Sequence, residues 1–344
     1  MRGEMSYRIA INGYGRIGQC LLRALFERGL ETKLQPVVIN ELAEPETVSY
    51  LTRYDTTHGR FPAPVTLKDD QLVIDDHIIQ ILNIPKAEDL PWRDMGIDLL
   101  MECSGSFSDR QTAELHVKQG AKRLLFSQPA TAEVDATVVF GLNQDSINVN
   151  HKVVSAASCT TNCVIPILDQ LDRHFGIEHG VTTTIHSAMN DQPVIDAYHH
   201  TDLRLTRSAL HSIIPVDTGL AKGIDRLLPS LEGKFKCLHL RVPTINVSLM
   251  DMSISLERDT TEEEINQLFK SLSEGPLKGL LGYTEEPHAS TDFNHDSRSV
   301  VVDGTQTRLS GKRLLKLVCW FDNEWGFANR MLDIAEHWLA LKQN

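Results

Sequence analysis

The architecture of the chain follows from residues 7–18, which read Tyr7-Arg8-Ile9-Ala10-Ile11-Asn12-Gly13-Tyr14-Gly15-Arg16-Ile17-Gly18. The first half is a short apolar segment of strand character, and the second half spaces its glycines as G-x-G-x-x-G. Beyond the turn, Ile17, Leu21 and Leu25 recur at helical spacing until Gly29, which supplies a stop. These residues therefore predict a strand, a glycine turn and a helix.

The glycine turn indicates a dinucleotide site. Its glycines allow a tight turn, a close approach of the backbone to a pyrophosphate and close helix packing, while the N-terminus of the helix faces the anion. A second strand, residues 34–40, follows and ends at Glu41. A carboxylate at this place accepts hydrogen bonds from the ribose hydroxyls and repels a 2′-phosphate. We therefore expect NAD rather than NADP; the alternative for Glu41 is a solvated acid at a strand end.

The order of strands and helices predicts two domains. In the first part, strand and helix patterns alternate, which is typical of a parallel, doubly wound sheet with right-handed connections. After residue 158 strand patterns follow one another with little helix between them, at 180–185, 237–242, 247–256, 299–302 and 314–321. We expect a Rossmann-type α/β domain over residues 1–158, completed by a C-terminal helix at 326–344. We expect an α+β catalytic domain with a mainly antiparallel sheet over residues 159–325.

Composition limits the possible partners. The formal net charge is −12 and no block of five or more basic residues occurs, which argues against nucleic acid. No apolar run is long enough for a membrane span, and the N-terminus lacks a secretory pattern. The six cysteines show no disulfide framework, and Cys159 with Cys163 lacks the second cysteine or histidine pair that zinc needs. We expect no metal and a cytoplasmic, thiol-keeping location.

The segment Ser158-Cys159-Thr160-Thr161-Asn162-Cys163 contains a candidate nucleophile. It lies between an apolar, β-branched run and an apolar-periodic run, so Cys159 falls where a strand passes into a helix. The first turn of a helix favours a thiolate and lowers a cysteine pKa from about 8.5 toward roughly 3.5 to 7.5. The local residues leave a buried, inert thiol equally open. Pro166 argues for a kinked helix or for one that begins later than Cys159.

Several signatures together resemble the phosphorylating glyceraldehyde-3-phosphate dehydrogenase family over essentially the whole chain. They are residues 7–18, 157–163, Ile185-His186, Thr218-Gly219, Arg241-Val242-Pro243-Thr244 and Asp322-Asn323-Glu324-Trp325-Gly326. Three further segments are more similar to the branch of the family that oxidises erythrose 4-phosphate. These are Asn40-Glu41-Leu42, Ile185-His186-Ser187-Ala188-Met189 and Asp292-Phe293-Asn294-His295-Asp296.

The resemblance implies roles for particular residues. It makes Cys159 the nucleophile and His186 its base, although a satisfied histidine at a strand end is the alternative for His186. It implies cofactor contacts from Gly13, Tyr14, Gly15, Arg16, Ile17, Gly18, Glu41, Ser127 and Asn323, the last with the nicotinamide amide. It implies substrate contacts from Ser158, Thr160, Arg204, Thr218, Gly219 and Arg241. A salt bridge is the alternative for Arg241. Residues 190–207 are implied to form a loop near the cofactor and a subunit interface of a homotetramer.

Met189 departs from the usual pattern of the family. Enzymes that phosphorylate glyceraldehyde 3-phosphate usually carry a threonine there, whose hydroxyl helps to bind a phosphate; methionine cannot donate that hydrogen bond. We therefore expect water rather than phosphate to cleave a thioester on Cys159. The resulting hypothesis is NAD-dependent oxidation of D-erythrose 4-phosphate to 4-phosphoerythronate, which in the resembled enzymes feeds pyridoxal phosphate synthesis. The alternative is phosphorylating oxidation of glyceraldehyde 3-phosphate in glycolysis or gluconeogenesis.

Overall fold

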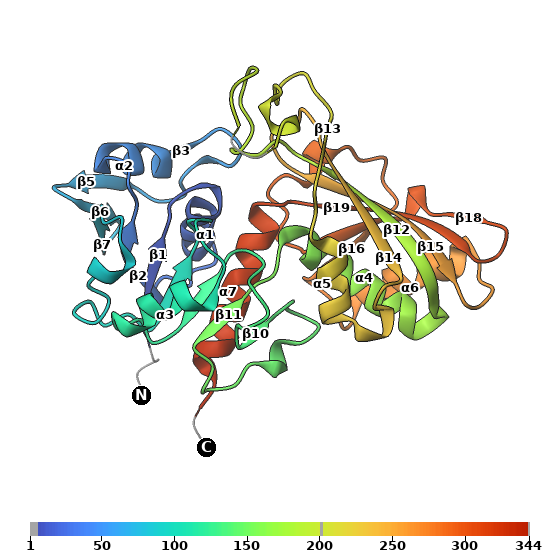
Figure 1. The fold of residues 1–344 in the computed structure, drawn as a ribbon, viewed down its shortest axis with the longest axis horizontal. Coiled ribbons are helices and arrows are strands. Elements are labelled where there is room, and N and C mark those ends of the chain that lie inside the picture. The colour runs from blue at the N-terminus through green and yellow to red at the C-terminus, as the bar shows by residue number, and fades with distance from the viewer. Residues whose placement is uncertain (1–5, 200–201, 343–344) are drawn as a thin grey trace. The chain divides into compact units, whose positions relative to one another are not determined.

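The computed structural model describes residues 6–199 and 202–342, which form two compact units. The first unit comprises the chain up to Ser158 and from Phe327 onward, and the second runs from Cys159 to Gly326. In the first unit the elements are β1 (Tyr7–Asn12), α1 (Arg16–Glu27), β2 (Leu34–Asn40), α2 (Pro45–Arg53), β3 (Tyr54–Asp55), β4 (Gly59–Arg60), β5 (Val65–Lys68), β6 (Gln71–Ile74), β7 (His77–Leu82), β8 (Leu99–Glu102), α3 (Arg110–Lys118), β9 (Leu124–Phe126), β10 (Ala136–Thr137) and β11 (Val153–Ser155). Helix α7 (Trp325–Ala340) returns the chain to this unit (Figure 1).

The first unit is built on a sheet with the strand order β10-β11-β9-β8-β1-β2-β7-β6-β5. Strand β1 pairs in parallel with both β2 and β8, so the strand order reverses at β1. The carboxyl ends of strands at such a reversal form the usual ligand crevice of a doubly wound fold. The predicted parallel, doubly wound sheet is confirmed; at one edge β5, β6 and β7 form an antiparallel meander that the sequence analysis did not predict.

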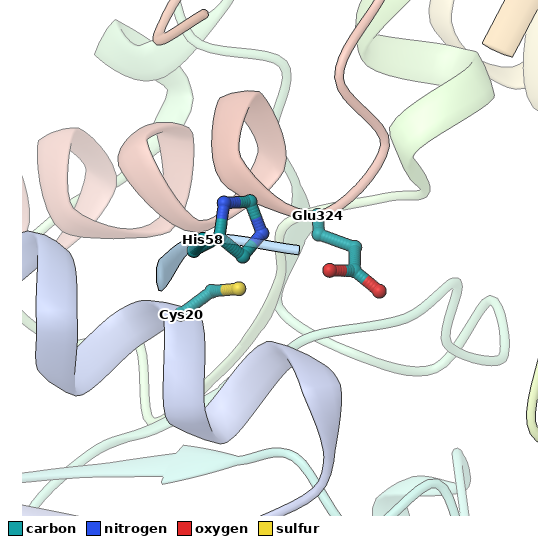
Figure 2. A group of neighbouring side chains, drawn as sticks. All are labelled: Cys20, His58 and Glu324. Carbon is teal, nitrogen blue, oxygen red and sulfur yellow. The ribbon is translucent and has the colours of Figure 1, made fainter. Parts of the chain in front are cut away.

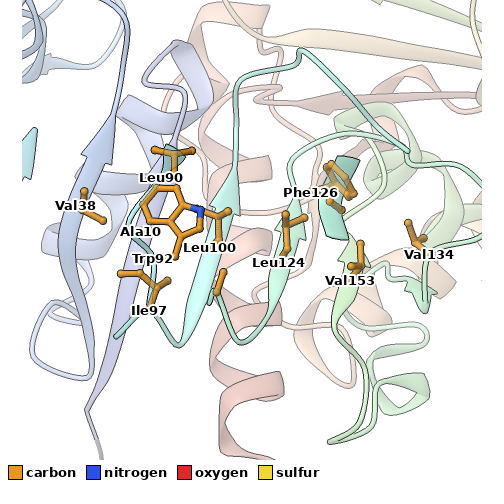
Figure 3. Close-up of a cluster of buried hydrophobic side chains, with 12 residues drawn as sticks. Ala10, Val38, Leu90, Trp92, Ile97, Leu100, Leu124, Phe126, Val134 and Val153 are labelled. Atoms are coloured by element: carbon orange, nitrogen blue, oxygen red, sulfur yellow. The ribbon is translucent and has the colours of Figure 1, made fainter. Parts of the chain in front are cut away.

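Both faces of this sheet are covered, because consecutive residues of β8 and β9, whose side chains point to opposite faces, are all buried. One face carries a buried cluster in which alternate residues of five strands meet Trp92, which is completely buried (Figure 3). The strand residues are Ala10, Val38, Leu100, Leu124, Phe126 and Val153. Ala113 of α3 packs into the same cluster. Helix α7 is joined to the C-terminal end of α1 because Arg28 forms ion pairs with Asp333 and Glu336.

The second unit contains α4 (Cys159–Phe175), β12 (Ile177–His186), β13 (Ile214–Val216), α5 (Leu220–Leu227), β14 (Phe235–Arg241), β15 (Ser248–Leu256), α6 (Glu262–Glu274), β16 (Leu281–Thr284), β17 (Val300–Asp303), β18 (Arg308–Ser310) and β19 (Leu314–Phe321). Its sheet has the order β13-β14-β12-β15-β19-β17-β16, with β18 paired to β19. The pairings β12–β14 and β16–β17 are parallel and the others are antiparallel. The mainly antiparallel sheet is therefore confirmed.

The register of this sheet places functional candidates side by side. His186 at the end of β12 is the direct partner of Arg241 at the end of β14. Ser248 at the start of β15 is opposite Phe321, which ends β19 just before Asp322 and Asn323. In the long connection from 187 to 213 the described residues are largely irregular, and Arg204–Thr206 forms a short 3-10 turn. Part of the loop predicted at 190–207, residues 200 and 201, lies outside the described residues.

Helix α4 begins at Cys159 itself, with Pro166 inside it. The expectation that the helix could begin later is wrong. Just before the helix, Ala157 has a φ of 60°, in the left-handed region that is costly for a residue with a side chain. Its N–H is held by the Ser155 hydroxyl at 3.0 Å. This strained corner turns the chain sharply at the start of α4.

Candidate active site

Cys159 and His186 are brought together in the second unit. The Sγ atom of Cys159 lies 3.6 Å from Nε2 of His186, although the two residues are 27 positions apart. The other ring nitrogen of His186, Nδ1, is 2.8 Å from the Ser187 carbonyl. A carbonyl can only accept a hydrogen bond, so Nδ1 carries the proton and Nε2 presents its lone pair to the thiol. The histidine is therefore oriented to take a proton from Cys159.

Burial keeps both members of this pair neutral. Burial raises the pKa of the Cys159 thiol to about 11, against the lowering effects of the Thr160 N–H and the Arg241 guanidinium. Burial and the nearby Arg241 charge lower the pKa of His186 to about 3. The expectation that the helix N-terminus lowers the pKa of Cys159 is wrong, because desolvation of the sulfur raises this pKa by more than the N-terminal N–H groups lower it. The thiol therefore keeps its proton, with the lone pair of His186 Nε2 3.6 Å away.

Arg241 supplies an unsatisfied positive charge beside this pair. It is only 9 % exposed, and its Nε and Nη1 atoms have no hydrogen-bond partner among the described residues. Its nearest carboxylate is Asp191, at 3.9 Å from Nη2. A buried guanidinium with free donors is costly unless an anion binds to it. The salt bridge considered as the alternative role of Arg241 therefore involves only Nη2 and leaves Nε and Nη1 without a partner among the described residues.

One other predicted substrate residue, Arg204, shares a cavity with Arg241. A cavity of about 770 Å³ is lined by Arg241 and Arg204 together with Asp191, Asp202 and Asp217. Thr218 and Gly219 precede α5, and the Thr218 hydroxyl accepts the Leu220 N–H at 3.2 Å. Ser158 and Thr160 are the two sequence neighbours of Cys159, and Thr160 is buried. The structure thus brings Arg204 and Arg241 to one cavity, whereas Thr218 and Gly219 lie outside its lining.

A separate cavity of about 560 Å³ opens at the carboxyl ends of β1, β2 and β8 in the first unit. Of the predicted cofactor residues in that unit, Gly13, Gly15 and Glu41 line it. Tyr14, Arg16, Ile17, Gly18 and Ser127 lie outside its lining. Arg16 forms a bidentate ion pair with Asp55, and the Tyr14 hydroxyl bonds Thr52. These two contacts join the glycine turn to α2 and to β3.

The glycine turn fits a bound dinucleotide. A Cβ atom at Gly13, whose φ is +86°, would lie 2.4 Å from the Ser104 backbone, and one at Gly18 would lie 2.4 Å from the Gly13 carbonyl oxygen. Gly15 instead faces open space, where a pyrophosphate can approach the backbone. The Glu41 carboxylate accepts the N–H groups of Tyr14 and Leu42, each at 2.7 Å. Its Oε1 atom also accepts the Ala43 N–H at 3.4 Å, whereas Oε2 accepts the Tyr14 N–H and retains a lone pair for a ribose hydroxyl.

Sequence reasoning missed several residues of both sites. Asn12 donates to the buried Glu102 carboxylate at 2.6 Å and accepts from Asn40 at 2.7 Å, which ties the ends of three strands beneath the cofactor cavity. In the second unit the His239 ring stacks on His186, with centroids 5.0 Å apart. A two-residue periodicity along β14 places His239 on the same face as Arg241. That periodicity was the signal available in the sequence.

Three side chains that offer metal-ligand atoms are drawn in Figure 2. Cys20 in α1 and His58 between β3 and β4 belong to the first unit, whereas Glu324 belongs to the second. Because they come from different units, no metal site is assigned to them. All six cysteines are free thiols. No helix within residues 6–199 and 202–342 is long and apolar enough to cross a membrane.

Three buried histidines predict a loss of stability in acid. Burial is the main cause that lowers the pKa of His116 and His239 to about 4 and that of His186 to about 3. Trp92 Nε1–H donates to Nδ1 of His116 at 3.0 Å, a bond that requires the neutral ring. The unfolded chain binds these protons from about pH 6.5 downward, so stability is complete above that pH and falls as the pH drops toward 4.

We expect the free energy of unfolding to fall by about 2 kcal/mol per buried histidine between pH 7 and pH 5. Urea unfolding at both pH values measures this change. The His239→Phe variant removes one titrating ring and should lose about a third of the pH dependence. His179, which is exposed on β12, supplies the matched control His179→Gln, whose pH dependence should equal that of the parent. Equal stability of the parent at pH 7 and pH 5 would contradict the account.

Comparison with known protein families covers both units. Residues 7–110 match the family model described as the glyceraldehyde 3-phosphate dehydrogenase NAD binding domain. Residues 158–323 match the family model described as the glyceraldehyde 3-phosphate dehydrogenase C-terminal domain. The first match contains the glycine turn and Glu41, and the second contains Cys159, His186, Arg241 and Asn323.

Proposed function

The chain belongs to the glyceraldehyde-3-phosphate dehydrogenase family and is an NAD-dependent oxidoreductase that acts on aldehydes, and within that family we propose that its substrate is D-erythrose 4-phosphate. The product would be 4-phosphoerythronate, released by water from a thioester on Cys159. In the resembled enzymes this product feeds pyridoxal phosphate synthesis, and we assign the same use here.

Met189 carries the choice of water over phosphate. It lies three residues after His186, and its side chain is 45 % exposed. Its backbone N–H donates a hydrogen bond to Oε1 of the Gln192 side chain at 3.3 Å. The thioether has no proton to donate, so the hydroxyl that phosphorylating members of the family use for phosphate is missing. An attacking phosphate therefore loses one of the hydrogen bonds that would hold it in place. An attacking water molecule next to His186 does not depend on that hydrogen bond.

The residues of the second unit divide the chemistry as follows. The Cys159 sulfur adds to the aldehyde carbon while His186 Nε2 takes the thiol proton, and that proton then passes to the oxygen of the hemithioacetal. The Cys159 backbone N–H and the protonated His186 stabilise negative charge on that oxygen. Bound NAD would supply the hydride acceptor. As hydride leaves the hemithioacetal carbon, His186 Nε2 takes the hydroxyl proton back, so the carbon becomes the carbonyl of a thioester on Cys159, and His186 then releases that proton to solvent. His186 next removes a proton from water, whose oxygen attacks the thioester carbonyl and displaces the Cys159 thiolate.

Arg241 is proposed to hold the substrate phosphate. Its Nε and Nη1 atoms have no hydrogen-bond partner among the described residues, and a dianionic phosphate would satisfy both. We expect Arg241→Met to lower kcat/KM for a phosphorylated aldehyde by about 10²-fold. The same change should leave kcat/KM for an unphosphorylated aldehyde within a few-fold.

Arg313 supplies the control for this change, because it lies outside the proposed sites and pairs with Glu178 and Asp259 through exposed side chains. Arg313→Met should keep nearly full activity with the phosphorylated aldehyde. Equal losses on phosphorylated and unphosphorylated aldehydes in Arg241→Met would remove the phosphate role from Arg241.

We also propose a homotetramer in the cytoplasm. The connection from 187 to 213 presents exposed apolar side chains, among them Val194, Ile195, Tyr198, Leu203 and Ile213. Such a group of exposed apolar residues is typical of a subunit interface, and the free thiols are consistent with a reducing compartment. Sedimentation equilibrium measures the assembly; a monomer at micromolar concentration would exclude it.

The substrate proposal is tested by steady-state NADH formation with erythrose 4-phosphate and with glyceraldehyde 3-phosphate, each with and without inorganic phosphate. We expect a higher kcat/KM for the four-carbon sugar and no requirement for phosphate. Ser158, Thr160, Thr218 and Arg241 are all retained, which favours phosphorylating oxidation of glyceraldehyde 3-phosphate as the second candidate. Strict dependence on phosphate with a preference for the three-carbon sugar would establish that alternative.

A further inference from the structure

A continuous hydrogen-bond network links the catalytic base to Asn323. The Ser187 carbonyl accepts the Nδ1 proton of His186 at 2.8 Å, and the Ser187 N–H donates to the Ser248 hydroxyl at 3.2 Å. The Ser248 hydroxyl donates in turn to Oδ1 of Asn323 at 2.8 Å. The Ser187 hydroxyl donates to the same Oδ1 atom at 3.1 Å. The base and Asn323, 137 positions apart in sequence, are therefore joined by two serines.

The network is buried and its members come from three separate strands or strand ends. Ser187 is 0 % exposed, Ser248 is 1 % exposed and Asn323 is 7 % exposed. Ser187 follows β12, Ser248 begins β15, and Asn323 comes two residues after β19. Because β15 pairs with both β12 and β19, Ser248 occupies the central position. Hydrogen bonds in such a dry place define geometry more strictly than bonds exposed to water.

The two serine hydroxyls determine which atom of the Asn323 amide is left to bind a ligand. Its amide oxygen already accepts two hydroxyl donors, so its amide nitrogen remains to donate elsewhere. The Ser248 hydroxyl oxygen accepts a hydrogen bond from the Ser187 N–H. The single hydroxyl proton of Ser248 is therefore directed to Oδ1 of Asn323. Loss of the Ser248 hydroxyl would remove one of the two bonds that hold the amide. It would also leave the buried Ser187 N–H without an acceptor.

We propose that Ser248 is a positioning residue that aims the Asn323 amide nitrogen at the carboxamide of the nicotinamide ring. Through Ser187 the same hydroxyl supports the carbonyl that orients His186. The inference rests on the role proposed for Asn323 as the nicotinamide contact. It predicts that Ser248 affects binding of the nicotinamide half of NAD and has no effect on the adenosine half.

Calorimetric binding of NAD and of ADP-ribose, which lacks the nicotinamide, separates positioning from a general structural role. We expect Ser248→Ala to weaken NAD binding by about 5- to 10-fold, as the loss of one buried hydrogen bond does, and to leave the Kd of ADP-ribose within twofold. Asn323→Ala should show the same pattern with a larger effect on NAD. Ser299→Ala is the matched control, because Ser299 is buried and its hydroxyl has no partner among the described residues.

Three outcomes would overturn the inference. Equal weakening of NAD and ADP-ribose in Ser248→Ala would show that the hydroxyl serves the fold alone. Selective weakening of NAD in Asn323→Ala but unchanged NAD binding in Ser248→Ala would leave the role of Asn323 in place and remove that of Ser248. No selective effect in either variant would reject the nicotinamide role of Asn323, and the positioning role with it.

Discussion

The Cys159→Ala variant is expected to lose turnover by on the order of 10⁴-fold or more, because removal of a nucleophile leaves no covalent route. The thiol lies 3.6 Å from His186 Nε2, and alanine keeps the helix start while it removes the reacting sulfur. NAD binding should be unchanged, since the glycine turn and Glu41 lie in the first unit. Steady-state NADH formation measures the loss, and calorimetry measures NAD binding.

Cys163→Ala is the matched control for this change. Cys163 lies one helical turn further along α4 and is fully buried, so its thiol is inaccessible to a substrate. We expect this variant to keep activity within a few-fold of the parent. Comparable activity of the parent and Cys159→Ala would eliminate the covalent mechanism.

His186→Asn is expected to lower kcat at neutral pH by about 10²- to 10⁴-fold, the usual contribution of a general base. Asparagine can still donate to the Ser187 carbonyl, but it has no basic nitrogen to accept the Cys159 proton. Alkylation of Cys159 by iodoacetamide at pH 7 should slow in parallel. Because burial raises the thiol pKa to about 11, alkylation in this variant should recover as the pH rises toward that value.

The exposed His179 on the same strand supplies the control for this experiment. His179→Gln should leave both kcat and the alkylation rate close to those of the parent. A His186→Asn variant with an unchanged alkylation rate and unchanged kcat would show that the 3.6 Å contact has no role in proton transfer.

Much of the fold could be predicted because the decisive signals are local. The glycine turn, the strand before it and the helix after it are specified by residues 7–29, and β19 was predicted with the bounds that the structure shows. Helices α2 and α5 were missed. Each is short, at nine and eight residues, and α2 begins with Pro45, which sequence patterns associate equally with turns. The parallel pairing of β12 with β14 depends on a connection whose path no local pattern reveals.

The sequence indicated several of the side chains that meet at the site, but it did not indicate how burial shifts their pKa values. The helix start suggested a lowered pKa for Cys159, but the thiol pKa is raised because residues distant in sequence exclude water from the sulfur. The stacking of His239 on His186 required the registration of two strands more than fifty positions apart. The same holds for Ser248, whose partners are 61 and 75 positions away. Periodicity along one strand can show which face a residue occupies, but the partner that it meets across the sheet follows from tertiary packing.

The thioester on Cys159 is the central claim, and mass spectrometry of the acid-quenched enzyme tests it most directly. The enzyme would be mixed with NAD and erythrose 4-phosphate, quenched within one turnover, and digested. We predict that the peptide containing Cys159 gains the mass of the aldehyde less two hydrogens, and that this addition is absent without NAD. An enzyme that forms NADH within that first turnover while the Cys159 peptide keeps its unmodified mass would contradict the account.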